Sequence, residues 1–177
     1  MTQTPVDAPV APSSLSQVAA RVEARLRPFL AGEIDRWETF DEALREPLEA
    51  LRDLVMAHAK RIRPTFCHWG AVAAGGAGDD PLVTDAGAAL ELLQAFALIH
   101  DDVMDGSAVR RGRRTAHLTF ADAHRDGGWK GEPRRYGEGV AILIGDLAHV
   151  YADQLIVNAP RDARAVWDAL RIELNAG

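Results

Sequence analysis

The sequence predicts an all-α protein of one domain. Its 177 residues include many Ala, Leu, Glu and Arg and only 6% aromatic residues, and this composition favours helices. Apolar residues recur three and four positions apart through most of the chain, which is the spacing of a helix with one buried face. A chain of this length can bury one hydrophobic core, so we expect several helices packed around a central one.

Two helices are expected in the N-terminal third. Residues 1–13 are rich in Pro, Thr and Ala and should form a disordered tail. A helix should begin near Ser16, a favoured capping residue, because apolar residues follow it at i, i+4 spacing: Val18, Val22, Leu26 and Leu30. A second helix is expected over about 40–59, where one side carries Leu44, Leu48, Leu51, Leu54 and Val55.

The middle of the chain should hold two more helices. Pro64 suits the first turn of an apolar helix over 65–74, which the Gly-rich segment "GGAGDDP" should end. Residues 84–104 carry apolar side chains on most sides of a helix, so we expect this helix to be central and buried.

The C-terminal third should contain three helices and a long loop. A weaker helical pattern covers 115–124, and the polar, Gly-rich segment 124–139, "HRDGGWKGEPRRYGEG", predicts a loop. Residues 140–159 have the length of a helix. Their β-branched start could suggest a strand, but no partner strand is expected anywhere in the chain. A last helix should begin near 161.

Charge, cysteine content and hydropathy narrow the class of protein. The net charge of −6 argues against a nucleic-acid binder, so any bound anion needs a local basic patch. The single cysteine, Cys67, fits a buried apolar role in a reducing cytoplasm. The N-terminus lacks a signal-peptide pattern, and the longest apolar run, 88–99, is shorter than the ~20 residues of a membrane span. We expect a cytoplasmic protein without a stable membrane span.

Three aspartates end the predicted central helix, in the segment "ALIHDDVMDGSAVRRGRRT". Asp101 and Asp105 should lie about 40° apart on one helix face, with Asp102 to the side. Like charges repel, and the C-terminal end of a helix favours cations, so this cluster carries a local cost. A bound Mg²⁺ would remove that cost, because Mg²⁺ prefers oxygen ligands. The alternative is a solvated acidic helix end.

Two basic clusters flank this acidic cluster in the sequence. One follows it and comprises Arg110, Arg111, Arg113 and Arg114. Arginine forks match phosphate oxygens, so the acids and arginines together suggest a receptor for a metal-bound diphosphate. The other cluster, Lys60, Arg61 and Arg63, precedes a helix start, where backbone N–H groups also favour anions. The alternatives are that the arginines neutralise the aspartates, and that the second cluster is a solvated basic loop.

The motifs resemble those of the trans-isoprenyl diphosphate synthases, or polyprenyl synthetases. They are "KRIRP", "ELLQAFALIHDDVMDGSAVRRGRRTAH" and "YG…AILIGDL", in that order. The resemblance covers roughly residue 51 to the end, and the pairing of DDxxD with RRGxxTxH is its most specific part. Residues 124–153 are similar to actinobacterial members with a longer loop. The resemblance implies an isoprenoid synthase-type helical bundle around a central cavity, Mg²⁺, and usually a homodimer.

The implied reaction condenses isopentenyl diphosphate with an allylic diphosphate to a short-chain trans-prenyl diphosphate. By the same resemblance, Asp101, Asp102 and Asp105 hold Mg²⁺, and Arg110 contacts the allylic diphosphate. The isopentenyl diphosphate contacts fall on Arg111, Lys60 and Arg63, with Gln94 donating to a phosphate oxygen. Ala59 stands where the family usually has Gly. His100 and His117 are expected to be structural.

Product length is expected to depend on Phe96 and Ala97, just before the aspartates. In the resembled family an aromatic residue at the position of Phe96 forms a floor that stops chain growth. A small residue at Ala97 is similar to enzymes that make geranylgeranyl diphosphate, with farnesyl diphosphate as the next candidate product. The alternative is that Phe96 is an ordinary core residue.

Part of the family pattern is not found in these 177 residues. The family has a second aspartate-rich motif and two lysines farther along, so we expect residues 14–177 to be the N-terminal part of an apparently truncated synthase domain. Alone, it should bind one Mg²⁺–diphosphate weakly and not turn over. The alternatives are a non-catalytic partner subunit, which the intact motifs disfavour, and a fragment of a class I terpene cyclase, which would lack the pairing of KRIRP with RRGxxT.

Overall fold

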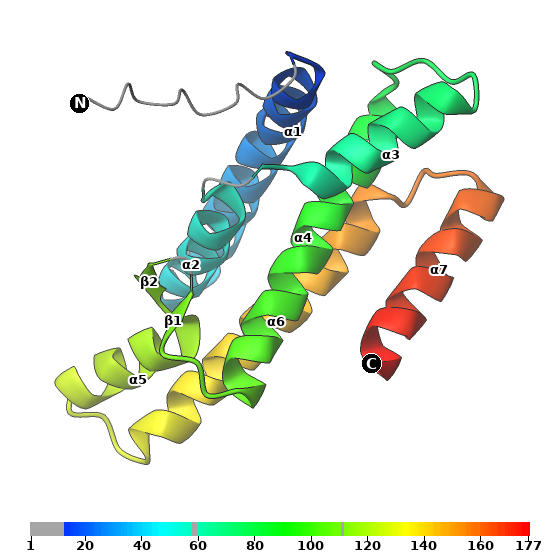
Figure 1. Cartoon of the computed structure of the whole chain (residues 1–177). Coiled ribbons are helices and arrows are strands. Elements are labelled where there is room, and N and C mark those ends of the chain that lie inside the picture. Colours follow the sequence, from blue (N-terminus) through cyan, green and yellow to red (C-terminus); the bar gives the residue numbers. More distant parts are fainter. Residues whose placement is uncertain (1–12, 58–59, 111) are drawn as a thin grey trace, which may run out of the picture.

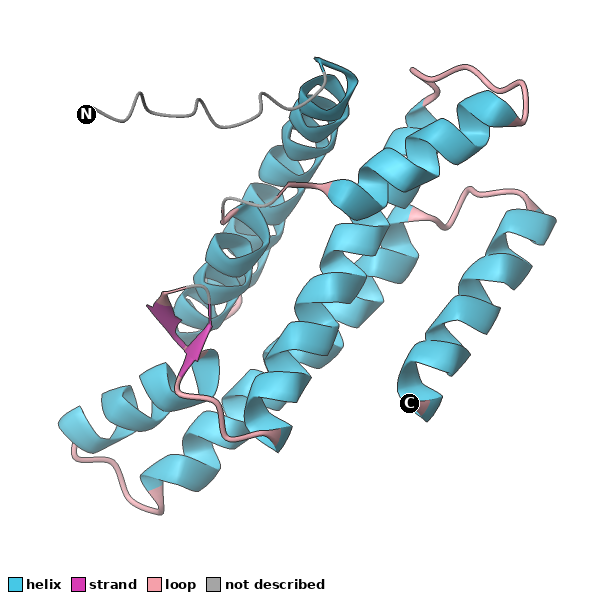
Figure 2. Cartoon of the chain, viewed as in Figure 1, coloured by secondary structure: helices cyan, strands magenta, loops and turns pink. Residues whose placement is uncertain are grey.

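The computed structural model describes residues 13–57, 60–110 and 112–177, and within them the chain is almost entirely helical (Figures 1 and 2). The predicted all-α class is therefore confirmed. The elements are, in order, α1 (Ser13–Glu38), a 3₁₀ turn η1 (Glu42–Leu44), α2 (Arg45–Met56), α3 (Ile62–Ala73), α4 (Pro81–Met104), strands β1 (Val109–Arg110) and β2 (Arg113–Arg114), α5 (Ala116–Asp126), α6 (Pro133–Leu155) and α7 (Arg161–Ala176). Most of the expected N-terminal tail, residues 1–12, lies outside the described residues.

Helix α4 is the central element, as predicted. It packs against α1, α2, α3 and α6, and α4 and α6 cross the middle of the molecule together (Figure 1). By length and composition α4 is also the one described helix that could cross a membrane, but half of its most apolar window is buried inside the protein. This is the pattern of a core helix, whose apolar faces are covered by neighbouring helices.

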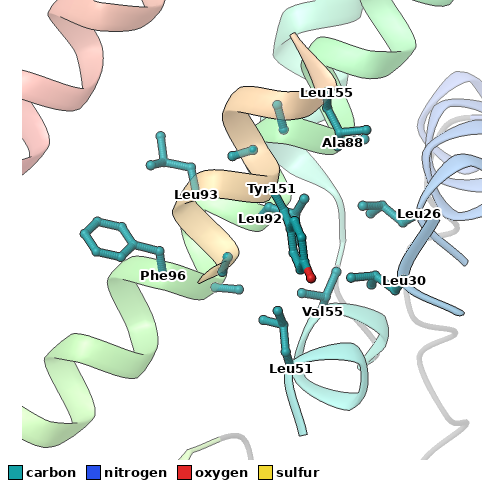
Figure 3. Close-up of a cluster of buried hydrophobic side chains, with 14 of the residues drawn as sticks. Leu26, Leu30, Leu51, Val55, Ala88, Leu92, Leu93, Phe96, Tyr151 and Leu155 are labelled. Carbon is teal, nitrogen blue, oxygen red and sulfur yellow. The ribbon is translucent and has the colours of Figure 1, made fainter. Parts of the chain in front are cut away.

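The core lies where α1, α2, α4 and α6 meet. Figure 3 shows Tyr151 of α6 among leucines and Val55 from the other three helices. The side chains of Leu26, Leu51 and Leu92 are fully buried, and each such burial contributes about 1.5–3 kcal/mol before entropy is counted. The predicted apolar face of α1 is buried along its length, through Val18, Val22, Leu26 and Leu30.

The starts of α4 and α6 were predicted too late, and in both cases a capping residue explains why. Helix α4 begins at Pro81 rather than near 84, because the Asp80 carboxylate accepts a hydrogen bond from the Leu82 amide at 2.8 Å. The long loop expected over 124–139 is confined to 127–132. Glu132 caps α6 by accepting from the amides of Arg134 and Arg135, and Pro133 occupies the first turn. The acidic cap and the following Pro thus start the helix at this point, although glycines in the segment disfavour a helix.

Helix α7 joins the bundle through α6. The Trp167 indole donates to the Asp153 carboxylate at 2.7 Å, and Arg171 pairs with Asp153 and with Asp168. Figure 1 shows α7 standing at the edge of the bundle. Several apolar residues of α7 are exposed, including Val166 and Ile172.

Candidate active site

The three candidate metal-binding aspartates lie at the C-terminal end of α4. Asp101 and Asp102 occupy the last helical turn, and Asp105 is the C-cap residue. Asp102 is buried, with 4% of the residue exposed, whereas Asp105 is exposed and the Asp101 side chain keeps 48% of its surface exposed. Helix geometry thus divides the cluster into one inward carboxylate and two carboxylates open to solvent.

Arg110 joins two of these aspartates. Its Nε donates to Asp102 Oδ1 at 2.8 Å, and Nη2 donates to Asp101 Oδ2 at 2.7 Å. The hydrogen bond with Asp102, followed by the bond with Asp101, raises the pKa of the guanidinium above its ordinary value against the opposing effect of desolvation. Arg110 therefore neutralises part of the acidic cluster. This agrees with the alternative in which the arginines neutralise the aspartates.

A small hairpin positions Arg110. Strands β1 and β2 pair antiparallel, with Arg110 opposite Arg113, and Gly112 takes a φ of +77° at the turn. The expectation that the chain contains no paired strands is therefore wrong at this hairpin, because two-residue strands are too short to show alternation of apolar and polar residues. Arg113 and Arg114 are exposed, and Arg111 lies outside the described residues. Of the described arginines in this cluster, Arg110 alone contacts the aspartates.

The base of the hairpin is held by Thr115, which the sequence analysis did not select as a functional residue. Its buried hydroxyl donates to the Ser107 carbonyl at 2.8 Å, and its amide donates to the Ala108 carbonyl at 3.2 Å. The Ser107 amide in turn donates to the Asp102 carbonyl at 3.0 Å. These bonds fix the start and end of the hairpin relative to α4. Thr115 is the threonine of the RRGxxTxH motif, and this position in the motif could have indicated its role from the sequence.

A cavity of about 820 Å³ lies beside this arrangement. Its lining comes from α2, from the end of α4, from the hairpin and from the start of α5, with Ile144 of α6: Ala50, Asp53, Leu54, Met56, Ala57, Ile99, Asp102, Arg110, Arg113, Arg114, Thr115, Ala116, Thr119 and Ile144. One wall is therefore largely apolar and the other carries three arginines. Of the predicted site residues, the cavity brings together Asp102 and Arg110.

The second basic cluster is divided by the fold. Lys60 and Arg63 are exposed where α3 begins, as an anion-binding role requires. Arg61 is buried, with 2% exposed, and pairs with Glu91 of α4. The interpretation of Arg61 as a third member of an anion-binding cluster is therefore wrong, because its charge is already matched inside the protein.

The residues proposed to set product length lie one to two turns before the aspartates on α4. Phe96 is buried, with its ring stacked on His149 of α6 at a centroid distance of 4.7 Å and set edge-on to His100 at 4.6 Å. Figure 3 shows Phe96 projecting from α4 away from Leu26 and Leu30. It does not line the cavity described above. Ala97 and Gln94 are partly buried.

The two histidines expected to be structural are well packed. His100 Nε2 lies 3.1 Å from the Ile142 carbonyl oxygen, which links α4 to α6. His117 of α5 is buried, and desolvation, as the largest influence, lowers its pKa below 6.5. Both environments fit packing residues.

The carboxylates of the acidic cluster suit a Mg²⁺ ion that also binds phosphate oxygens of a second molecule. Within the described part of the chain, no group of three or more His, Cys, Asp or Glu side chains converges into a preformed metal site. Asp101 and Asp105 offer two accessible carboxylates on one helix face. Mg²⁺ commonly uses one or two carboxylates and completes its shell with waters and phosphate oxygens, so these two residues meet that requirement.

Comparison with known proteins places this site in a family. The family model of the polyprenyl synthetases matches residues 44–175, which include the whole α4–hairpin arrangement. The chain belongs to the polyprenyl synthetase family. A protein named "Probable farnesyl diphosphate synthase" from Bradyrhizobium diazoefficiens is 34% identical to this chain over 151 residues, and a geranylgeranyl diphosphate synthase of Mycobacterium tuberculosis is 32% identical over 146 residues.

The fold agrees with that of solved relatives. The crystal structure of geranylgeranyl pyrophosphate synthase from Corynebacterium glutamicum, complexed with isoprenyl diphosphate and magnesium, matches with a TM-score of 0.73 at 32% identity, over 89% of this chain and 45% of that one. The Bradyrhizobium and Mycobacterium relatives are matched over 82% and 76% of this chain and over 37% of their own lengths. This polyprenyl synthetase chain therefore spans less than half the length of these relatives.

Proposed function

We propose that this polyprenyl synthetase chain forms part of a Mg²⁺-dependent trans-prenyltransferase, which condenses isopentenyl diphosphate with an allylic diphosphate. The observation that carries the proposal is the bridging of Asp101 and Asp102 by Arg110 at the end of a buried helix. Acids and an arginine held at one point give a metal-bound diphosphate both its cation ligands and a hydrogen-bond donor. The named relatives support the reaction class.

Each residue of the proposed site has a separate task. Asp101, Asp102 and Asp105 would hold Mg²⁺, and the carboxylate of Asp102 would also keep Arg110 in place from within the protein. Mg²⁺, when bound, supplies positive charge that stabilises the departing diphosphate. Arg110 would donate to the oxygens of the allylic diphosphate, where negative charge develops as the allylic bond breaks.

Isopentenyl diphosphate would bind at the other basic segment. Lys60 and Arg63 are exposed at the start of α3, and their cationic groups suit a diphosphate. Gln94 can donate to a phosphate oxygen through its amide. Arg111, outside the described residues, completes the proposed set. The isopentenyl double bond then attacks the allylic carbon that the diphosphate leaves. The resulting cation gives up a proton to the departed diphosphate, and the electrons of that C–H bond form the new alkene.

The proposed product is geranylgeranyl diphosphate, with farnesyl diphosphate next. Phe96 offers a bulky ring on α4 that is held against His149 and His100, and Ala97 beside it is small. We further propose that the protein acts as a homodimer in the cytoplasm. The 177-residue chain alone should bind Mg²⁺ and diphosphate weakly without condensing substrates.

Binding calorimetry on the chain tests the site directly. Inorganic pyrophosphate should bind in the presence of Mg²⁺ and lose affinity by about tenfold or more in Asp101→Ala or Asp105→Ala, because each carboxylate supplies a metal ligand. Asp126→Asn, at the exposed end of α5, is a matched control that should leave the affinity unchanged. Mg²⁺-dependent binding that survives in both aspartate variants would refute the metal assignment.

A condensation assay with radiolabelled isopentenyl diphosphate tests the reaction. Robust product from the 177-residue chain alone would overturn the proposal that the chain does not turn over. In a longer synthase that contains this chain, Asp101→Ala should abolish Mg²⁺-dependent turnover.

A further inference from the structure

We propose that Arg61 is a positioning residue, which locks the Lys60–Arg63 segment onto α4 and so sets where isopentenyl diphosphate is bound. The identity of that ligand rests on the proposed function. The attachment of this segment to α4 is inferred from the backbone conformation and side-chain contacts of Arg61. The proposed diphosphate and metal sites do not account for these two features.

The backbone of Arg61 adopts an unusual conformation. Its φ of +48° and ψ of +40° lie in the left-handed region, and among the described non-glycine residues no other has a positive φ. An L-residue with a long side chain enters this region at an energetic cost, so surrounding contacts must hold it there. Such residues gather at sites where the direction of the chain matters for function.

The side chain of Arg61 provides the holding contacts. It is 1% exposed, and Nη1 donates to Glu91 of α4, which is itself 8% exposed, while Nε donates to Glu23 of α1 at 3.3 Å. One guanidinium therefore ties the start of α3 to two other helices. Removing either partner of such a buried ion pair destabilises the protein, because the remaining partner is left as an uncompensated charge in the interior.

The carbonyl of Arg61 begins the following helix. It accepts from the Thr65 amide at 3.1 Å and from the Thr65 hydroxyl at 2.8 Å. The first turn of α3, which carries Arg63, is thereby built on the residue that the ion pairs immobilise. Lys60 directly precedes Arg61, so its backbone joins α3 through the same immobilised residue.

The anchor also relates the basic segment to the rest of the proposed site. Glu91 lies three residues before Gln94, so the two are neighbours on one side of α4. The same helix carries Asp101 in its last turn, ten positions beyond Glu91 in the sequence. Because Arg61 binds Glu91, the two exposed cations Lys60 and Arg63 hold a constant position relative to Gln94 and to the aspartates. Preorganised binding groups of this kind raise affinity, because less ordering is needed when the ligand arrives.

Variants of Arg61 and Glu91 separate positioning from plain stabilisation. Arg61→Gly accepts the left-handed backbone but removes the guanidinium, Arg61→Lys keeps a charge without the fork, and Glu91→Gln changes only one carboxylate. Arg45→Ala is a matched control, because Arg45 also pairs with two glutamates, Glu38 and Glu49, but at the α1–α2 corner. All are compared at a temperature where each variant is folded by circular dichroism.

The first measurement is calorimetric binding of isopentenyl diphosphate, with Mg²⁺–pyrophosphate binding as the second ligand. Arg61→Gly and Glu91→Gln should weaken isopentenyl diphosphate binding by about tenfold and leave Mg²⁺–pyrophosphate binding within about twofold. Arg61→Lys should restore part of the affinity, and Arg45→Ala should change neither. A folded Arg61→Gly or Glu91→Gln variant with unaltered isopentenyl diphosphate affinity would overturn the positioning role.

The second measurement is amide hydrogen exchange over residues 60–66, which needs no ligand. Exchange should become faster there in Arg61→Gly than in Arg45→Ala, because the first turn of α3 loses its anchor. Equal protection in both variants would overturn the anchoring. Failure of the unaltered chain to bind isopentenyl diphosphate would instead refute the proposed ligand, and this exchange comparison would then decide the anchoring by itself. If Arg61→Gly does not fold, Glu91→Gln supplies both measurements.

Discussion

The carbonyl oxygen of His117 occupies the space into which a side chain at Gly137 would extend. A Cβ at Gly137 would clash with that oxygen and would lie 2.7 Å from the Ala121 amide nitrogen. Both obstacles belong to the backbone of α5, which cannot turn away as a side chain could. Helices α5 and α6 therefore pack at a distance that only glycine at position 137 permits. Since α5 begins just after the hairpin, this contact also supports the position of Arg110.

Gly137→Ala is expected to destabilise the protein by about 3 kcal/mol, because the added methyl group forces two helix backbones apart. Gly139→Ala, two residues along the same helix, meets no atom within 4 Å. It should stabilise by about 0.5–1 kcal/mol, as Ala replaces Gly in a helix. Urea unfolding of the two variants measures both effects, and equal stability changes would contradict the packing argument.

Arg110→Ala is expected to lower both stability and diphosphate affinity. It leaves the buried Asp102 carboxylate without its partner, which costs about 1–3 kcal/mol. It also removes the proposed donor to the allylic diphosphate. Arg113→Ala, on the opposite hairpin strand, should stay within about 0.5 kcal/mol of the unaltered protein, because Arg113 is exposed. Thermal unfolding and pyrophosphate calorimetry report the two effects, and similar stability losses in both variants would show that the bridge to Asp102 has no net effect.

Local signals in the sequence predicted the helices and their buried faces well. Val22 and Leu26 follow the helical period, and that period alone decides which face of α1 is apolar. The hairpin of Arg110 and Arg113 was missed, because it consists of four paired residues around Gly112 and has no apolar alternation. The start of α6 was placed too late, because the glycines near Trp129 hid the Glu132–Pro133 cap.

The candidate site was predictable where its residues are close in the chain. The three aspartates lie on one helical turn, so their separation into Asp102 inside and Asp101 outside follows from a period of 3.6 residues. The role of Arg61 was not predictable, because its partners Glu91 and Glu23 are 30 and 38 residues away. Nothing within "KRIRP" distinguishes the buried cation from its two exposed neighbours.

Stability should rise with pH in the weakly acidic range, in part through His149. Desolvation, followed by the nearby Arg171 charge, lowers the pKa of His149 below 6.5. The unfolded chain therefore binds a proton at His149 more readily than the folded protein does, so stability is lost as pH falls from 6.5 toward the lower folded-state pKa. His149→Phe keeps a ring beside Phe96 and should flatten this dependence.

The measurement is the unfolding midpoint of both proteins between pH 5 and about pH 7.5, a range that spans the ordinary histidine pKa. His117 also has a lowered pKa, so the variant should retain a reduced slope rather than none. An unchanged slope in His149→Phe would assign the pH dependence to other groups.

Phe96→Ala in a synthase that contains this chain is expected to shift products toward longer prenyl chains, because it removes the bulky ring from the proposed floor. The buried ring stacks on His149, so the same change should also cost about 3–5 kcal/mol of stability.

Ala97→Phe should act in the opposite direction and shorten the products by narrowing the space beside Phe96. Chromatography of the dephosphorylated alcohols, with one allylic primer throughout, measures chain length. Leu98→Ala, two positions beyond Phe96 on α4, is the control for general loosening of the helix. If it lengthens products as much as Phe96→Ala does, the floor is not a property of Phe96, and the ring is then an ordinary core residue held between α4 and α6.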